Sequence, residues 1–143
     1  MTPYHIFQEL IPTVLQKAFL KMALLFVPDR LYKDISVYLN LNVECVTCYA
    51  KGVSYHVGQK MHSSNHEYNV INLDNKWYPI DSTWGAGHLE GKSFVKEYKE
   101  YYFLADPELL IKTHFPVNDK WQLTKKKYIL DEYLSWPYVR GNF

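Results

Sequence analysis

The chain has few cysteines and almost no net charge. Its 143 residues include only two cysteines, Cys45 and Cys48, which is too few for a disulfide framework. Lysine and arginine number 16 against 15 aspartates and glutamates, a net charge of +1. This balance gives no electrostatic basis for binding nucleic acid or an acidic membrane surface. The low cysteine content favours a reducing compartment, so we expect a cytoplasmic protein.

Long apolar runs are also missing. The most apolar stretch, residues 18–27, is interrupted by Lys21 and is too short to cross a bilayer. The first sixteen residues contain Glu9 but no lysine or arginine, unlike the basic start of a signal peptide. No repeat or linker is visible, and 17% aromatic residues predict a packed core. We therefore expect one domain over residues 1–143.

The order of predicted elements is helices first, then a sheet, then short helices. Apolar spacing and proline positions predict helices over 13–27 and 31–40. The strand-forming residues lie at 43–49, 66–73 and 77–80, with further strand and turn in KGVSYHVGQ and a turn at Gly85-Ala86-Gly87. Short helices are predicted from Asp106-Pro107 to about residue 114 and near 129–135. This order indicates an α+β fold with N-terminal helices packed on an antiparallel sheet.

The segment 66–80 is predicted to be a β-hairpin that turns at Asp74-Asn75, because both residue types tolerate left-handed backbone. In that register Leu73 faces Lys76, Tyr68 faces Asp81 and His66 faces Thr83. His66 and Asp81 then become diagonal neighbours on one face, within reach of each other. Pro79 cannot donate a ladder hydrogen bond, which suggests an edge strand.

A histidine held by an aspartate forms two thirds of a nucleophile–base–orienter triad. The spacing alone is more typical of an ordinary sheet histidine beside an aspartate near a turn. A zinc site is a further alternative, because Cys45-x2-Cys48 and His62-x3-His66 approach two-cysteine, two-histidine spacing. Gly52 and Gln59 stand where a zinc finger needs core residues, so this alternative is weaker.

Several motifs point to a family. They are YAKGVSYHVGQ (49–59), HEYN (66–69), NKWYPIDSTWGAG (75–87), YYFLADPELLIKTHFP (101–116) and WQL (121–123). In sequence and in order they resemble the transglutaminase-like domain of the kyphoscoliosis-peptidase and hillarin group, cytoskeleton-associated proteins with a papain-like Cys–His–Asp arrangement. The resemblance runs from about residue 30 to the C-terminus, whereas residues 1–30 diverge. It implies a papain-like core, no cofactor and protein partners that include cytoskeletal ones.

The resemblance also implies roles for four residues. His66 corresponds to the general base and Asp81 to the acid that orients it. Trp84 follows the aspartate as in the family and would wall the substrate cleft or pack in the hairpin core. Asn69 matches the asparagine of the histidine motif and is expected to brace the strand.

The nucleophile is where the sequence departs from the family. The family's cysteine opens a helix, and the matching slot here is about residues 24–30, which contain no cysteine, serine or threonine. Cys45 and Cys48 follow the predicted helix instead of opening it. We therefore expect a catalytically inactive binding or scaffolding module. A cysteine peptidase or acyl-transfer enzyme remains the alternative, with its nucleophile unrecognised or on a part of the protein missing from this chain. The ending WPYVRGNF resembles the point where longer members continue, which suggests a fragment of a multidomain protein.

Overall fold

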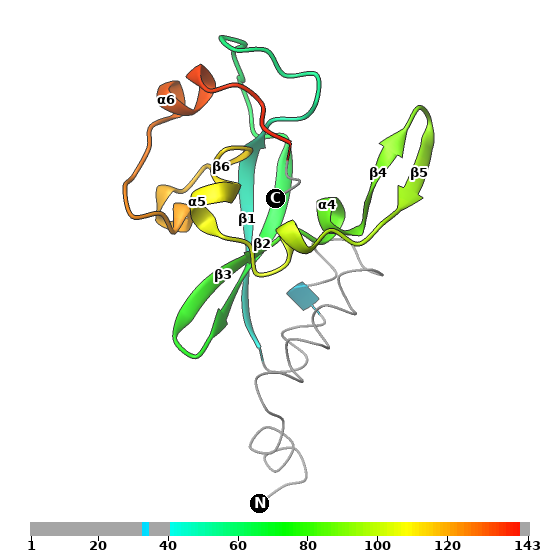
Figure 1. Ribbon diagram of the computed structural model, residues 1–143. Helices are drawn as coiled ribbons and strands as arrows, with labels where there is room; N and C mark the ends of the chain where they lie inside the picture. The colour runs from blue at the N-terminus through cyan, green and yellow to red at the C-terminus, as the bar shows by residue number, and fades with distance from the viewer. Residues whose placement is uncertain (1–32, 35–40, 141–143) are drawn as a thin grey trace, which may run out of the picture.

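The computed structural model describes residues 33–34 and 41–140. The predicted helix at 13–27 and the expected nucleophile slot at 24–30 lie outside the described residues. Of the predicted helix at 31–40 only residues 33–34 are described, and these two are helical. Four strands form an antiparallel sheet in the order β3-β2-β1-β6: β1 (Asn42–Ala50), β2 (His66–Leu73), β3 (Lys76–Ile80) and β6 (His114–Pro116). A small mixed domain with an antiparallel sheet and few helices confirms the α+β class (Figure 1).

The hairpin β2–β3 has the predicted register. Leu73 pairs with Lys76 and Asn69 with Ile80, and the two turn residues, Asp74 and Asn75, have φ angles of 52° and 64°. Two left-handed residues in a two-residue loop match the right-handed twist of the strands. β3 is an edge strand among the described residues, as Pro79 suggested.

The ladder ends at Ile80, because Asp81 caps a short helix, α4 (Ser82–Ala86), instead of continuing the strand. Its side chain accepts a hydrogen bond from the backbone N–H of Trp84, as an N-cap residue does. The predictions that Thr83 lies on a strand opposite His66 and that Gly85-Ala86-Gly87 forms a simple turn are therefore wrong. Gly87 instead begins β4 (Gly87–Glu90), which pairs with β5 (Ser93–Lys96).

After β5, the described part of the chain adds four short helical elements beside the sheet. They are η1 (Glu100–Tyr102), α5 (Pro107–Leu110), η2 (Asp119–Gln122) and α6 (Leu130–Ser135). Two predictions need correction here. α5 ends at Leu110 and does not reach residue 114, which starts β6, and residues 51–59 form loops and turns with no strand. The helix predicted near 129–135 is confirmed as α6.

Each face of the sheet has its own apolar core. Val46, Cys48 and Ala50 of β1 pack with Tyr68 and Val70 of β2 on one face. On the other face Val43 packs with Ile71, Leu73 and Ile80. Side chains alternate between faces along a strand, so His66 shares the face of Tyr68 and Val70. The first face therefore carries His66, at the start of β2.

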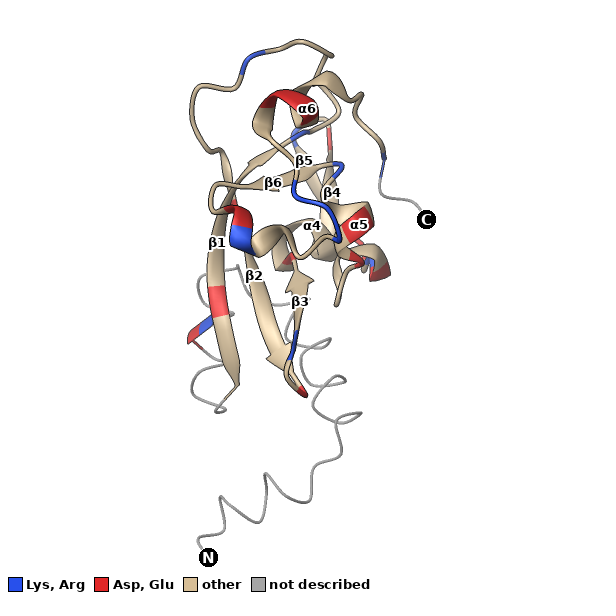
Figure 2. Ribbon diagram, turned by 90° about the vertical axis from the view of Figure 1, so that its left-hand side faces the viewer, with Lys and Arg blue, Asp and Glu red and all other residues tan. Residues whose placement is uncertain are grey.

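Acidic and basic residues are interspersed along the ribbon of the described residues in Figure 2. Among the described residues, no helix combines the length and the apolar character needed to cross a membrane.

Candidate active site

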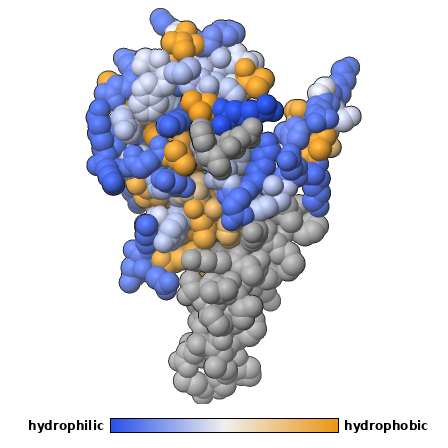
Figure 3. Space-filling model, viewed as in Figure 1, coloured by the Kyte–Doolittle hydropathy of each residue, from blue (hydrophilic) through white to orange (hydrophobic). Residues whose placement is uncertain are grey.

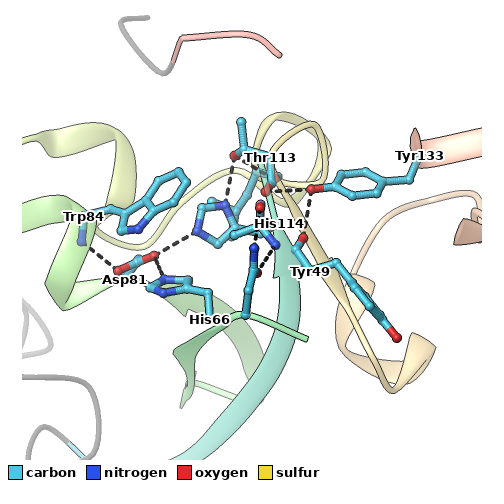
Figure 4. A network of polar contacts seen from close by, with 10 residues as sticks. Tyr49, His66, Asp81, Trp84, Thr113, His114 and Tyr133 are labelled. Carbon is cyan, nitrogen blue, oxygen red and sulfur yellow. Dashed lines mark hydrogen bonds and ion pairs between the residues drawn. The ribbon is translucent and has the colours of Figure 1, made fainter. Parts of the chain in front are cut away.

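Two histidines from two different strands meet at one carboxylate oxygen of Asp81 (Figure 4). His66, the first residue of β2, places Nε2 2.6 Å from Oδ2 of Asp81. His114, the first residue of β6, places Nε2 2.8 Å from the same oxygen. The other oxygen of Asp81, Oδ1, accepts the backbone N–H of Trp84 at 2.8 Å. The predicted contact between His66 and Asp81 is thus present, with a second histidine added.

Burial differs sharply within this cluster. The side chains of Asp81 and His114 are fully buried, whereas that of His66 is 13% exposed. Among the three residues, His66 is therefore the one that solvent or a bound molecule reaches. This is the arrangement that a base and its buried orienting acid require.

The electrostatics make Asp81 an anion. Burial by itself raises the pKa of its carboxyl, but hydrogen bonds from His114 and His66 and their attraction outweigh burial and hold the pKa well below the usual range. Burial also lowers the pKa of His114, and the attraction of Asp81 does not fully offset it. His114 is accordingly neutral at pH 7, while the carboxylate keeps its charge.

Trp84 lies against both imidazoles. Its ring centroid is 5.3 Å from that of His66 and 4.6 Å from that of His114. Tyr68 and Tyr102 complete the aromatic surroundings, with ring centroids 5.5 Å and 6.1 Å from His114. Trp84 thus covers the imidazole pair from the side of α4.

Asn69 does not join the cluster. It lies three residues after His66 on β2, so its side chain points to the opposite face of the sheet, where it is fully buried. This position suits a residue that braces the strand and excludes direct contact with the histidines.

The four residues of the zinc alternative do not converge. Cys45 and Cys48 are three residues apart on β1 and therefore point to opposite faces. His62 lies in the exposed loop between β1 and β2, and His66 is held by Asp81. Among the described residues, the group whose ligand atoms lie close enough for a metal is His66, Asp81 and His114.

The distances between the ligand atoms of that group fit hydrogen bonds better than coordination of a metal ion. In a tetrahedral zinc site with bonds of about 2.0 Å, neighbouring ligand atoms stand roughly 3.3 Å apart. The separations of 2.6 Å and 2.8 Å between the imidazole nitrogens and Oδ2 are those of charge-assisted hydrogen bonds.

His114 and its neighbour Thr113 are the site residues that sequence reasoning missed. They stand in the segment YYFLADPELLIKTHFP, but a helix was predicted to run through them. The signal in the sequence is the pair of β-branched and aromatic residues around His114, Thr113 and Phe115, which favours a strand over a helix.

No family model matches the chain. Individual relatives do match. The chain is 38% identical to mouse kyphoscoliosis peptidase over 106 residues, which are 71% of this chain and 16% of that protein. It is 31% identical to Drosophila melanogaster hillarin over 127 residues, and 29% identical to a LIM and transglutaminase domain protein of Caenorhabditis elegans over 126 residues, each covering 79% of this chain.

The chain belongs to this group as a transglutaminase-like domain. It spans about a sixth of the length of these relatives, at 16% to 17%. The family that its motifs resembled is thereby confirmed, whereas the activities and partners of the whole relatives remain proposals for this chain.

Proposed function

We propose that this chain is a papain-like domain that keeps the base and its orienting acid but supplies no nucleophile, and that it acts as a protein-binding module. The positions of its two cysteines carry the proposal. Cys45 lies on the face of β1 opposite His66 and contacts Glu67, with its Sγ 3.9 Å from Oε2. Cys48 lies on the same face as His66 but is fully buried in the apolar core.

Burial argues against Cys48 as a nucleophile. A catalytic thiolate needs access to substrate and an electropositive surrounding such as a helix N-terminus. Cys48 instead lies near the end of the central strand β1, in the apolar core with Val46 and Ala50. A peptide carbonyl would have to enter the core to reach its sulfur.

The alternative is a cysteine peptidase or acyl-transfer enzyme. One observation favours it: Cys48 and His66 are direct partners across β1 and β2. In that mechanism a thiolate attacks a carbonyl carbon, His66 takes the thiol proton, and the imidazolium later protonates the leaving group. His66 and Asp81 have the geometry for their parts in this sequence.

Labelling with a thiol-reactive peptidyl epoxide separates the two functions. We expect labelling of the native protein to be slow and unchanged by His66→Ala, because neither cysteine is activated by the imidazole. Mass spectrometry locates the label, with Cys45→Ala and Cys48→Ala as matched controls. Rapid, stoichiometric labelling of Cys48 that disappears in His66→Ala would establish the enzyme and reject the binding module.

A protein-binding role is supported by the β4–β5 hairpin, which projects away from the sheet (Figure 1). Leu89 and Phe94 are cross-strand partners on this hairpin and are 70% and 56% exposed. Apolar surface is visible on the hairpin in Figure 3. Two large apolar side chains exposed on one face of a projecting hairpin are typical of a contact surface.

The resemblance suggests cytoskeletal partners, which co-sedimentation with actin filaments or microtubules tests. We expect the protein to sediment with one of these filaments and the double variant Leu89→Ser/Phe94→Ser to stay in the supernatant. Ile129→Ser is the matched control, because Ile129 is similarly exposed at 62% but stands just before α6. Absence of binding to both filaments would reject the cytoskeletal role, and equal loss in the control would reject the hairpin as its site.

A further inference from the structure

The Asp81 carboxylate forms hydrogen bonds with two imidazoles, and the second of them distinguishes this site from a simple His–Asp pair. Oδ2 accepts from Nε2 of both His66 and His114, while Oδ1 accepts from the Trp84 backbone. Each hydrogen bond to a carboxylate oxygen stabilises the anion. His114 therefore supplies one of the three contacts that keep Asp81 charged without solvent.

The second ring nitrogen of His114, Nδ1, faces Thr113, and this contact indicates which nitrogen carries the proton. Oγ1 of Thr113 lies 2.8 Å from Nδ1 of His114 and 3.3 Å from the carbonyl oxygen of Leu110. That carbonyl already accepts the backbone N–H of Thr113 at 3.0 Å. The hydroxyl of Thr113 has one proton, and of its two contacts the one with Nδ1 is the shorter, so we assign this proton to Nδ1, which then acts as the acceptor nitrogen. A neutral imidazole that accepts at Nδ1 carries its proton on Nε2, where it faces Asp81.

The opposite tautomer is disfavoured by charge. With its proton on Nδ1, His114 would turn the lone pair of Nε2 toward the carboxylate at 2.8 Å. The fully charged form is disfavoured by complete burial and by the nearby imidazole of His66, whose ring centroid is 5.4 Å away. One protonation state of His114 satisfies both of its neighbours.

We propose that His114 is a positioning residue of this site: Thr113 fixes its tautomer, and its Nε2–H holds Asp81 as the anion that orients His66. Asp81 then has no proton of its own to donate, so Nε2 of His66 must be the donor in their contact. His66 consequently presents Nδ1, the basic nitrogen, away from Asp81. This inference concerns the orientation of the base, so it stands whether or not the chain has a nucleophile.

The two phenols beside the cluster are uncharged near pH 7. Burial raises the pKa of Tyr68 and of Tyr102, so both phenols keep their protons. Cys48 is the third neighbour, across the ladder from His66. The charge in direct contact with His66 is that of Asp81, whose Oδ2 lies 2.6 Å from Nε2.

Nitrogen NMR of protein labelled with 15N-histidine tests the proposal. In the native protein we expect His114 to show a protonated Nε2 and an unprotonated Nδ1 at pH 7 and above. His114→Phe removes the donor and keeps the bulk. The carboxylate then binds the His66 imidazolium more tightly, so the titration midpoint of His66 should rise by roughly one pH unit.

Thr113 provides a second, milder test. Thr113→Val removes the hydroxyl and leaves Nδ1 of His114 without its donor, so the Nδ1 signal should shift, while Thr113→Ser keeps the hydroxyl and the native spectrum. These two variants decide the question if His114→Phe fails to fold. A His66 midpoint that is unchanged in His114→Phe, or an unchanged Nδ1 signal of His114 in Thr113→Val, would overturn the proposal. Stoichiometric zinc bound by the native protein and lost in His114→Phe would also overturn it, because a metal would replace both shared protons.

Discussion

Asp81→Asn is expected to lower the free energy of unfolding by about 3 kcal/mol, because it breaks a buried, charge-assisted network. The wild-type carboxylate accepts three hydrogen bonds, from His66 and His114 on one oxygen and from the Trp84 backbone on the other. An amide has only one acceptor oxygen. Whichever way it turns, its NH₂ group faces an N–H donor.

Urea denaturation at pH 7 measures this loss. Asp74→Asn is the matched control, because Asp74 is an exposed residue with positive φ in the hairpin turn, where asparagine is equally suitable. The control should change stability by less than about 0.5 kcal/mol. A variant Asp81→Asn as stable as the wild type would mean that the carboxylate is not ionised in the folded protein.

The pH dependence of stability follows from the same group. The pKa of Asp81 is lower in the folded protein than its ordinary value of 3.8, so its stabilisation is fully present above that pH and is lost as the pH falls below it. His114 also lowers stability as the pH falls, and its effect begins at a higher pH than that of Asp81. Its pKa is lowered by folding, so below pH 6.5 the folded protein binds fewer protons than the unfolded chain. Wild-type stability should therefore fall below pH 6.5 and more steeply below 3.8, and Asp81→Asn should lack the second fall.

The parts of the site that the sequence predicted are local ones. His66 and Asp81 are joined by one hairpin, whose turn residues Asp74 and Asn75 adopt the left-handed backbone that their side chains tolerate. The register of such a hairpin is set within fifteen residues of chain. Counting along the two strands was therefore enough to bring the imidazole to the carboxylate.

The missed parts depend on contacts distant in sequence. His114 reaches Asp81 because β6 pairs with β1, where His114 lies opposite Ala50. The helix signal at Asp106-Pro107 is genuine, since Asp106 caps α5. It was extended too far because the strand signal of Thr113 and Phe115 is short, and the pairing with β1 that completes the strand cannot be read from the local sequence. The same reason explains why residues 51–59 were assigned a strand although they form a loop.

Lys51→Met is expected to lower the free energy of unfolding by about 2 kcal/mol at pH 7, because Lys51 fastens the C-terminal helix α6 to the sheet. Lys51 follows the last residue of β1 and is fully buried. Its ammonium donates to the carbonyl oxygen of Tyr133 and, at 2.9 Å, to that of Trp136. It also lies 3.9 Å from the centre of the Tyr133 ring. Methionine fills the space but donates to neither carbonyl.

A pH series distinguishes the charge from the packing. Burial lowers the pKa of Lys51 to about 8 from an ordinary value of 10.5. Between these two values the unfolded chain binds a proton that the folded protein does not, so Lys51 makes the wild type more stable as the pH rises from 8 to 10.5. The stability gap between wild type and Lys51→Met should accordingly widen from pH 8 to 10. Lys92→Met, at an exposed lysine in the β4–β5 turn, is the control and should show no widening.

We expect weaker attachment of α6 to the sheet to affect the histidine cluster as well. The hydroxyl of Tyr133 in α6 lies 2.8 Å from the carbonyl oxygens of both Tyr49 and Thr113. Thr113 in turn holds the tautomer of His114 (Figure 4). We expect Lys51→Met to increase hydrogen exchange across residues 130–136 and to broaden the nitrogen signals of His114, while Lys92→Met leaves both unchanged. Faster exchange in α6 with unchanged His114 signals would show that the cluster is held by the sheet alone, independently of the C-terminal helix.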